Sequence, residues 1–116
     1  MREKQVEQRL VKAVRAAGGI CPKLVSPGMN GMPDRLLLMP GARMAFVEVK
    51  APGKEPRQLQ THRHQQLRAL GFPVFVLDDP EKVPWILEEV VFRGHLLSSM
   101  EIAFIDHPSK NNPVFF

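Results

Sequence analysis

The chain has 116 residues, of which 24% are charged, with a formal net charge of +4 and a pI near 9.6. This length suits one domain with its own hydrophobic core, and no apolar run approaches the roughly 20 residues that a membrane span needs. A single cysteine excludes a disulfide within the chain, and the polar start MREKQVEQR lacks the apolar stretch of a secretory signal, so we expect a cytoplasmic protein. The positive charge is typical of proteins that bind nucleic acid, and equally of many mildly basic proteins that do not.

The first third of the chain predicts a helix over residues 3–17, because its apolar residues recur at helical spacing and two glycines follow. Residues 20–25 follow as a short extended piece, and residues 26–33 are rich enough in Gly and Pro to form a loop. Two strand candidates come next, at 34–39 and 44–50. The turn sequence PGAR between them predicts a β-hairpin.

The remainder predicts a helix over about 56–70, a buried strand at 73–77 and a third helix over about 80–92. The resulting order, α-β-β-β-α-β-α, predicts an α/β fold with a mixed central β-sheet flanked by helices. Residues 94–116 show no clear periodicity. They are expected to form a C-terminal tail outside a domain of residues 1–93, as a dimer or packing segment.

The second predicted strand carries an unusual pair of charges. Glu48 and Lys50 are two residues apart, so their side chains leave the same face of the strand, while Val47 and Val49 point the other way into the core. Charges at successive same-face positions of a core strand cost free energy unless they are paired or liganded. The alternative is a surface ion pair, since an isolated E-x-K sequence is common.

The hairpin brings Asp34 into this pattern. If the turn centres on Gly41, residues whose numbers sum to 82 are paired, and Asp34 faces Glu48. Directly opposed residues have Cβ atoms about 4.5–5.5 Å apart, so the two carboxylates repel each other unless a cation such as Mg²⁺ lies between them. Lys50 can then reach the attacking water or the scissile phosphate. The set therefore predicts metal-dependent hydrolysis of phosphodiesters.

Two segments carry a family resemblance: GMPDR at residues 31–35 and FVEVKAPG at residues 46–53. They closely resemble the VRR-NUC family of the PD-(D/E)xK nuclease superfamily, whose short members come largely from phages and prophages. The resemblance covers about residues 3–92. It implies a restriction-endonuclease-like core, a nuclease domain over residues 1–93 and a bacterial host.

The resemblance also implies roles for the residues of these segments. Asp34, Glu48 and the backbone carbonyl of Val49 are the implied metal ligands, and Lys50 is implied to act on the nucleophile or phosphate. The implied cofactor is Mg²⁺, with Mn²⁺ as the alternative.

Two further catalytic residues follow from the family pattern. An acid on the first helix is matched by Glu7, which becomes a further metal ligand, and a glutamine on the helix after E-x-K is matched by Gln60. Gln58 competes for the second role. The simpler interpretations are an acid that favours the helix dipole and a solvated glutamine.

Four basic residues that follow or adjoin the catalytic segments are candidates for binding DNA: Arg35, Lys54, Arg57 and Arg63. The alternative for each is a solvated surface position. His62 and His64 lie two apart on a predicted helix and do not share a face, and with one cysteine a zinc site is not expected.

The leading hypothesis is a metal-dependent, structure-selective endodeoxyribonuclease, such as a Holliday-junction resolvase. The alternatives are a nickase, exonuclease or restriction-like nuclease with the same site, or a catalytically silent DNA-binding module. Symmetric cutting of a junction needs two active sites, which favours a homodimer. Its candidate interface is the apolar run at residues 90–92 together with apolar residues of the tail.

Overall fold

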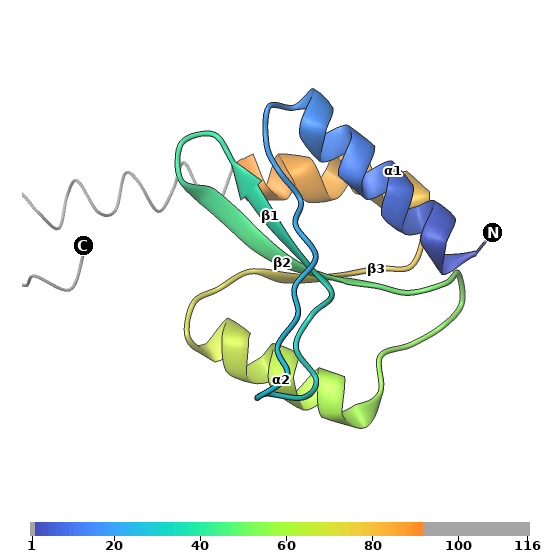
Figure 1. The fold of residues 1–116 in the computed structure, drawn as a ribbon, viewed down its shortest axis with the longest axis vertical. Coiled ribbons are helices and arrows are strands. Elements are labelled where there is room, and N and C mark those ends of the chain that lie inside the picture. The colour runs from blue at the N-terminus through green and yellow to red at the C-terminus, as the bar shows by residue number, and fades with distance from the viewer. Residues whose placement is uncertain (1, 92–116) are drawn as a thin grey trace, which may run out of the picture.

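The computed structural model describes residues 2–91, and the expectations for Phe92 and the tail lie outside this range. Helix α1 (Glu3–Ala16) and a helix at residues 83–91 cover one face of a β-sheet, and helix α2 (Gln58–Ala69) covers the other (Figure 1). Within the described range, no helix has the length and apolar character to cross a membrane. The expected mixed sheet between helices is confirmed.

The sheet has three strands in the order β1 (Arg35–Met39), β2 (Arg43–Val49) and β3 (Val74–Leu77). β1 is antiparallel to β2, with pairs that run from Arg35–Val47 to Met39–Arg43. Every pair therefore sums to 82, and the predicted hairpin register is confirmed. β3 returns parallel to β2 after α2 has crossed over the sheet.

Residues 20–25, predicted as a short extended piece and counted as the first strand, do not form a continuous strand. This segment makes only two isolated bridges to β1, Ile20–Leu38 and Lys23–Arg35. Pro22 lies between the bridges, and proline has no N–H to donate, so a continuous ladder cannot form there. The observed order is α-β-β-α-β-α, with a single 3₁₀ turn, η1 (Pro80–Lys82), before the last helix.

The two faces of the sheet differ in chemistry. On the α1 side, Val6, Leu10 and Val14 form a helical stripe that is fully buried in one core with β2 residues Val47 and Val49. On the other side, α2 buries few residues, and His64 is one of them. The α1 face therefore provides the hydrophobic core, while the α2 face is free to hold polar groups.

The helix at residues 83–91 corrects one expectation. Val90 is 1% exposed and packs in the hydrophobic core, so it is not available as the expected interface residue. Its neighbour Val91 is 40% exposed. The interface prediction now rests on Val91 and on residues beyond the described range.

Candidate active site

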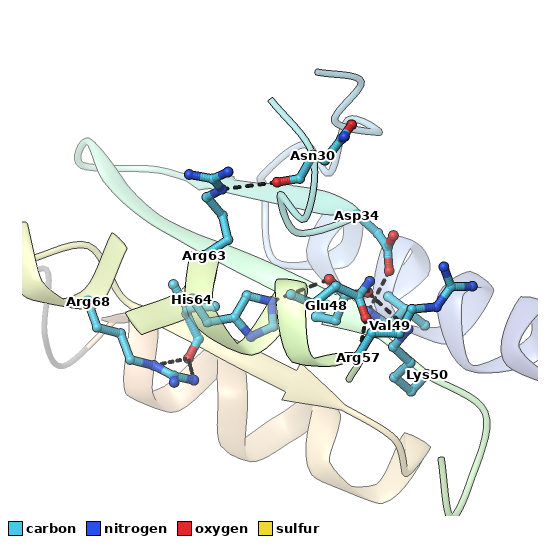
Figure 2. Close-up of polar contacts among 11 residues, drawn as sticks. Asn30, Asp34, Glu48, Val49, Lys50, Arg57, Arg63, His64 and Arg68 are labelled. Carbon is cyan, nitrogen blue, oxygen red and sulfur yellow. Dashed lines mark hydrogen bonds and ion pairs between the residues drawn. The ribbon is translucent and has the colours of Figure 1, made fainter. Parts of the chain in front are cut away.

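Asp34, Glu48 and Lys50 come together at the end of the hairpin that lies away from its turn (Figure 2). The Glu48 residue has no exposed surface, and Lys50 Nζ lies 3.6 Å from Glu48 Oε2. The strand register places Asp34 opposite Glu48, one residue before β1 begins. These three residues, predicted from the sequence, therefore form one cluster.

Backbone hydrogen bonds fix the two outer members of the cluster. Asp34 follows the buried Pro33, and its Oδ2 accepts a hydrogen bond of 2.9 Å from the Val49 N–H. The Lys50 N–H donates to the Leu77 carbonyl oxygen at 2.9 Å, which continues the parallel pairing with β3 beyond the end of β2. The Asp34 side chain thus joins β1 to β2, and the hydrogen bond to Leu77 fixes the position of the Lys50 backbone.

Helix α2 holds both carboxylate oxygens of Glu48. Gln60 Nε2 donates to Glu48 Oε2 at 3.0 Å, and Gln60 Oε1 accepts from the Arg57 N–H at 2.8 Å. His64 Nε2 lies 3.4 Å from Glu48 Oε1. Gln58 is exposed, so the structure brings Gln60 rather than Gln58 to the cluster.

His64 also contacts Glu48, although it was not predicted as a site residue from the sequence. It is 2% exposed, and its ring faces Glu48 in Figure 2. The sequence signal was the spacing of four residues from Gln60, which puts both side chains on one face of a helix.

The pKa of Glu48 is raised from an ordinary value of 4.5 to about 8. Burial is the largest cause, and the carboxyl of Asp34 adds to the rise through a hydrogen bond and charge repulsion, while Lys50 opposes it. Burial also lowers the pKa of His64, with Arg68 adding to the effect. The neutral forms of Glu48 and His64 are therefore favoured near pH 7 without metal, so their contact is one between neutral groups.

The cluster fits a hard cation that keeps much of its water. Mg²⁺ is commonly bound through one or two carboxylates plus waters, and Asp34 and Glu48 supply two. In residues 2–91 no group of three or more His, Cys, Asp or Glu side chains is arranged to hold a metal ion. Any further ligands would have to come from the backbone, such as the predicted Val49 carbonyl, or from water and substrate.

Glu7, predicted as a further metal ligand, contacts Arg35 rather than a member of this cluster. Its Oε2 accepts a hydrogen bond from Arg35 Nε at 3.2 Å, and Arg35 Nη1 donates to the Cys21 carbonyl oxygen at 2.9 Å. The physical reason is strand alternation, because Asp34 and Arg35 are consecutive and their side chains leave opposite faces. Arg35 turns toward α1 and holds Glu7 there.

The four basic candidates occupy different environments. Arg35 is partly buried in its ion pair with Glu7, and Arg63 Nε donates to the Asn30 carbonyl oxygen at 3.0 Å, which ties the loop of residues 26–33 to α2. Lys54 and Arg57 are exposed. Arg57 also lines a hollow of about 380 Å³ between that loop and α2, and Gln60 borders the same hollow.

Asp34 lies opposite Glu48 in the hairpin, with Lys50 two residues on and Gln60 from the crossover helix, which is the arrangement implied by the resemblance to PD-(D/E)xK nucleases. In sequence, the chain is 48% identical over 81 residues to "Putative nuclease p44" of Acyrthosiphon pisum secondary endosymbiont phage 1, covering 70% of this chain and 87% of that protein. A solved structure described as a VRR_NUC domain matches with a TM-score of 0.70 and 29% identity, over 76% of this chain and 97% of that one. Models of protein families give no match. The chain belongs to the VRR-NUC family of nucleases.

Proposed function

We propose that the protein is an Mg²⁺-dependent endodeoxyribonuclease that hydrolyses phosphodiester bonds in branched or otherwise structured DNA, such as four-way junctions. The observation that carries this proposal is the fully buried Glu48, set between Asp34 and Lys50. A carboxylate at this position costs free energy in the folded protein. A divalent cation that binds both acids offsets the cost and supplies a reason for the arrangement.

The chain's own residues have distinct parts in this reaction. Asp34 and Glu48 would hold the cation, which when bound supplies Lewis-acid stabilisation of the phosphate and makes a water more acidic. Lys50 presents an ammonium beside the acids, where it offsets the negative charge that develops on the phosphate oxygens in the transition state. Gln60 and His64 fix the two oxygens of Glu48, so that little reorganisation is needed during the reaction.

The proposed preference for branched DNA requires two active sites that act together. The described chain presents one Asp34–Glu48–Lys50 cluster, and paired cuts on a junction need two such sites, which favours a dimer with two-fold symmetry. The exposed Lys54 follows the cluster in sequence, and the exposed Arg57 donates its N–H to Gln60. Both are proposed to hold phosphates that flank the scissile bond.

The test is incubation of the full chain with labelled four-way junction, splayed-arm and linear duplex DNA, in Mg²⁺, Mn²⁺ or EDTA. Lys50→Ala should abolish cleavage while the fold and most of the DNA binding remain. Lys82→Ala is the matched control, because that lysine pairs with Asp78 on the exposed surface, with Nζ and Oδ1 2.6 Å apart.

Paired, metal-dependent cuts in the junction support a resolvase, and cleavage of a different substrate keeps the chemistry but changes the role. Binding without cleavage of any DNA, in every metal, contradicts the enzymatic proposal and leaves a silent DNA-binding module. Full activity of Lys50→Ala contradicts the assigned site.

A further inference from the structure

A groove of about 470 Å³ runs beside α1, and its lining is dominated by positive side chains. Lys4, Lys12 and Arg15 come from α1, and Arg35 comes from the start of β1. The acid in the lining is Glu7, which is already engaged by Arg35 at 3.2 Å. The groove therefore keeps a surplus of positive charge that Glu7 does not neutralise.

The helical cations are arranged in a line. Residues 4, 8, 12 and 15 recur every three or four positions, so they share one side of α1, and Gln8 adds an amide between the lysines. At a rise of about 1.5 Å per residue, Lys4 and Arg15 are about 16 Å apart along the helix. Lys4, Lys12 and Arg15 are exposed, and none of them makes an ion pair within residues 2–91.

A row of unpaired cations along a groove suits a linear polyanion better than a small anion. One strand of duplex DNA advances about 3.4 Å per nucleotide, so this row spans the phosphates of about five nucleotides. A single phosphate or carboxylate would neutralise the cations at one end of the row, and the cations at the other end would still repel one another.

The position of the groove connects it to the candidate active site. Arg35 lines the groove, and Asp34, the residue before it, belongs to the acidic cluster. Because consecutive side chains leave opposite faces, the groove begins one residue away from the cluster but on the α1 side of the hairpin. DNA that contacts both must bend around the N-terminal end of β1 or present two arms, as branched DNA does.

We infer that the α1 groove binds the phosphate backbone of a DNA arm that leads away from the scissile bond. This inference rests on the proposed function for its substrate, and its evidence is independent of the catalytic residues. It assigns to α1, through Lys12 and Arg15, a role in substrate binding that is separate from its packing role.

The experiment measures binding of fluorescent four-way junction and linear duplex DNA to the full chain in EDTA, across a range of salt concentrations. Arg15→Gln is compared with Arg9→Gln, a matched control on the same helix that is exposed and does not line the groove. The double variant Lys12→Gln/Arg15→Gln should weaken binding roughly ten-fold or more and lower the salt slope by about 1.8, since each lost phosphate contact removes about 0.9. Circular dichroism and thermal melting confirm that each variant is folded.

The results separate this inference from the proposed function. A loss for Arg15→Gln with no loss for Arg9→Gln supports the groove, even if the wild-type protein cleaves no DNA. Equal losses in the two variants, unchanged binding in the double variant, or no DNA binding by the wild type overturns it. Lys50-dependent cleavage together with unchanged binding in the double variant overturns the groove alone.

Discussion

Glu48 should make the metal-free protein less stable as the pH rises, and Glu48→Gln should remove that dependence. The folded state raises the pKa of Glu48 from 4.5 to about 8, so it binds this proton more tightly than the unfolded state does. The stabilisation is fully present below about pH 4.5 and is lost as the pH rises toward 8. The loss is about 1 kcal/mol at pH 5 and about 3 kcal/mol at pH 7, because one pKa unit corresponds to about 1.4 kcal/mol.

The assay is urea unfolding in EDTA at pH 5, 6, 7 and 8, with the free energy of unfolding compared between wild type and Glu48→Gln at each pH. Subtracting one curve from the other removes the contributions of titrating groups that do not interact with Glu48. Relative to wild type, the free energy of unfolding of Glu48→Gln should rise by about 2 kcal/mol between pH 5 and pH 7. Glu88→Gln, which changes an exposed glutamate, should show no such gain.

Saturating Mg²⁺ should make wild type more stable than Glu48→Gln at pH 8, because the cation binds the ionised carboxyl, which in EDTA has only Lys50 as a partner of opposite charge. Parallel curves for wild type and Glu48→Gln in EDTA would refute the idea that burial of this carboxyl is costly. With that result, the main physical argument for a cation at the cluster would also fail.

Two further predictions concern α2. His64→Gln should raise the Mg²⁺ concentration needed for half-maximal cleavage roughly ten-fold, because residues that orient a metal ligand typically contribute this much to metal affinity. An unchanged Mg²⁺ dependence would show that His64 only packs against Glu48. Arg63→Ala should speed proteolytic cleavage within residues 26–33 about five-fold, because it removes an exposed hydrogen bond to the Asn30 carbonyl worth about 1 kcal/mol. Cleavage at the wild-type rate would show that other contacts hold the loop.

The hairpin and its register were predictable because local rules determine them. Strand side chains alternate with a period of two, and the turn lies at Gly41 and Ala42, which both have positive φ, of 80° and 59°. Glycine adopts such a φ without strain, so the turn position can be identified from the amino-acid sequence. The alternation and the turn position together are sufficient to place Asp34 opposite Glu48.

Contacts between distant elements were not predictable in the same way. Whether Glu7 reaches the acidic cluster depends on Arg35, whose ion pair with Glu7 joins residues 28 apart in sequence. The contact of His64 with Glu48 depends on how α2 is rotated over the sheet, and α2 carries little apolar periodicity from which that rotation could be deduced. The strand expected at residues 20–25 failed for a local reason, Pro22, which was visible in the sequence.

In β2, side chains that stabilise the fold alternate with side chains that form the candidate site. Val47 and Val49 are buried against α1, and full burial of such side chains contributes about 1.5–3 kcal/mol each, which strongly favours this register. A slip of one residue would expose both valines and turn Glu48 and Lys50 into the hydrophobic core. The valines therefore do more than stabilise the fold: they hold Glu48 under Gln60 and His64, where its burial cost can be offset only by a proton or a cation.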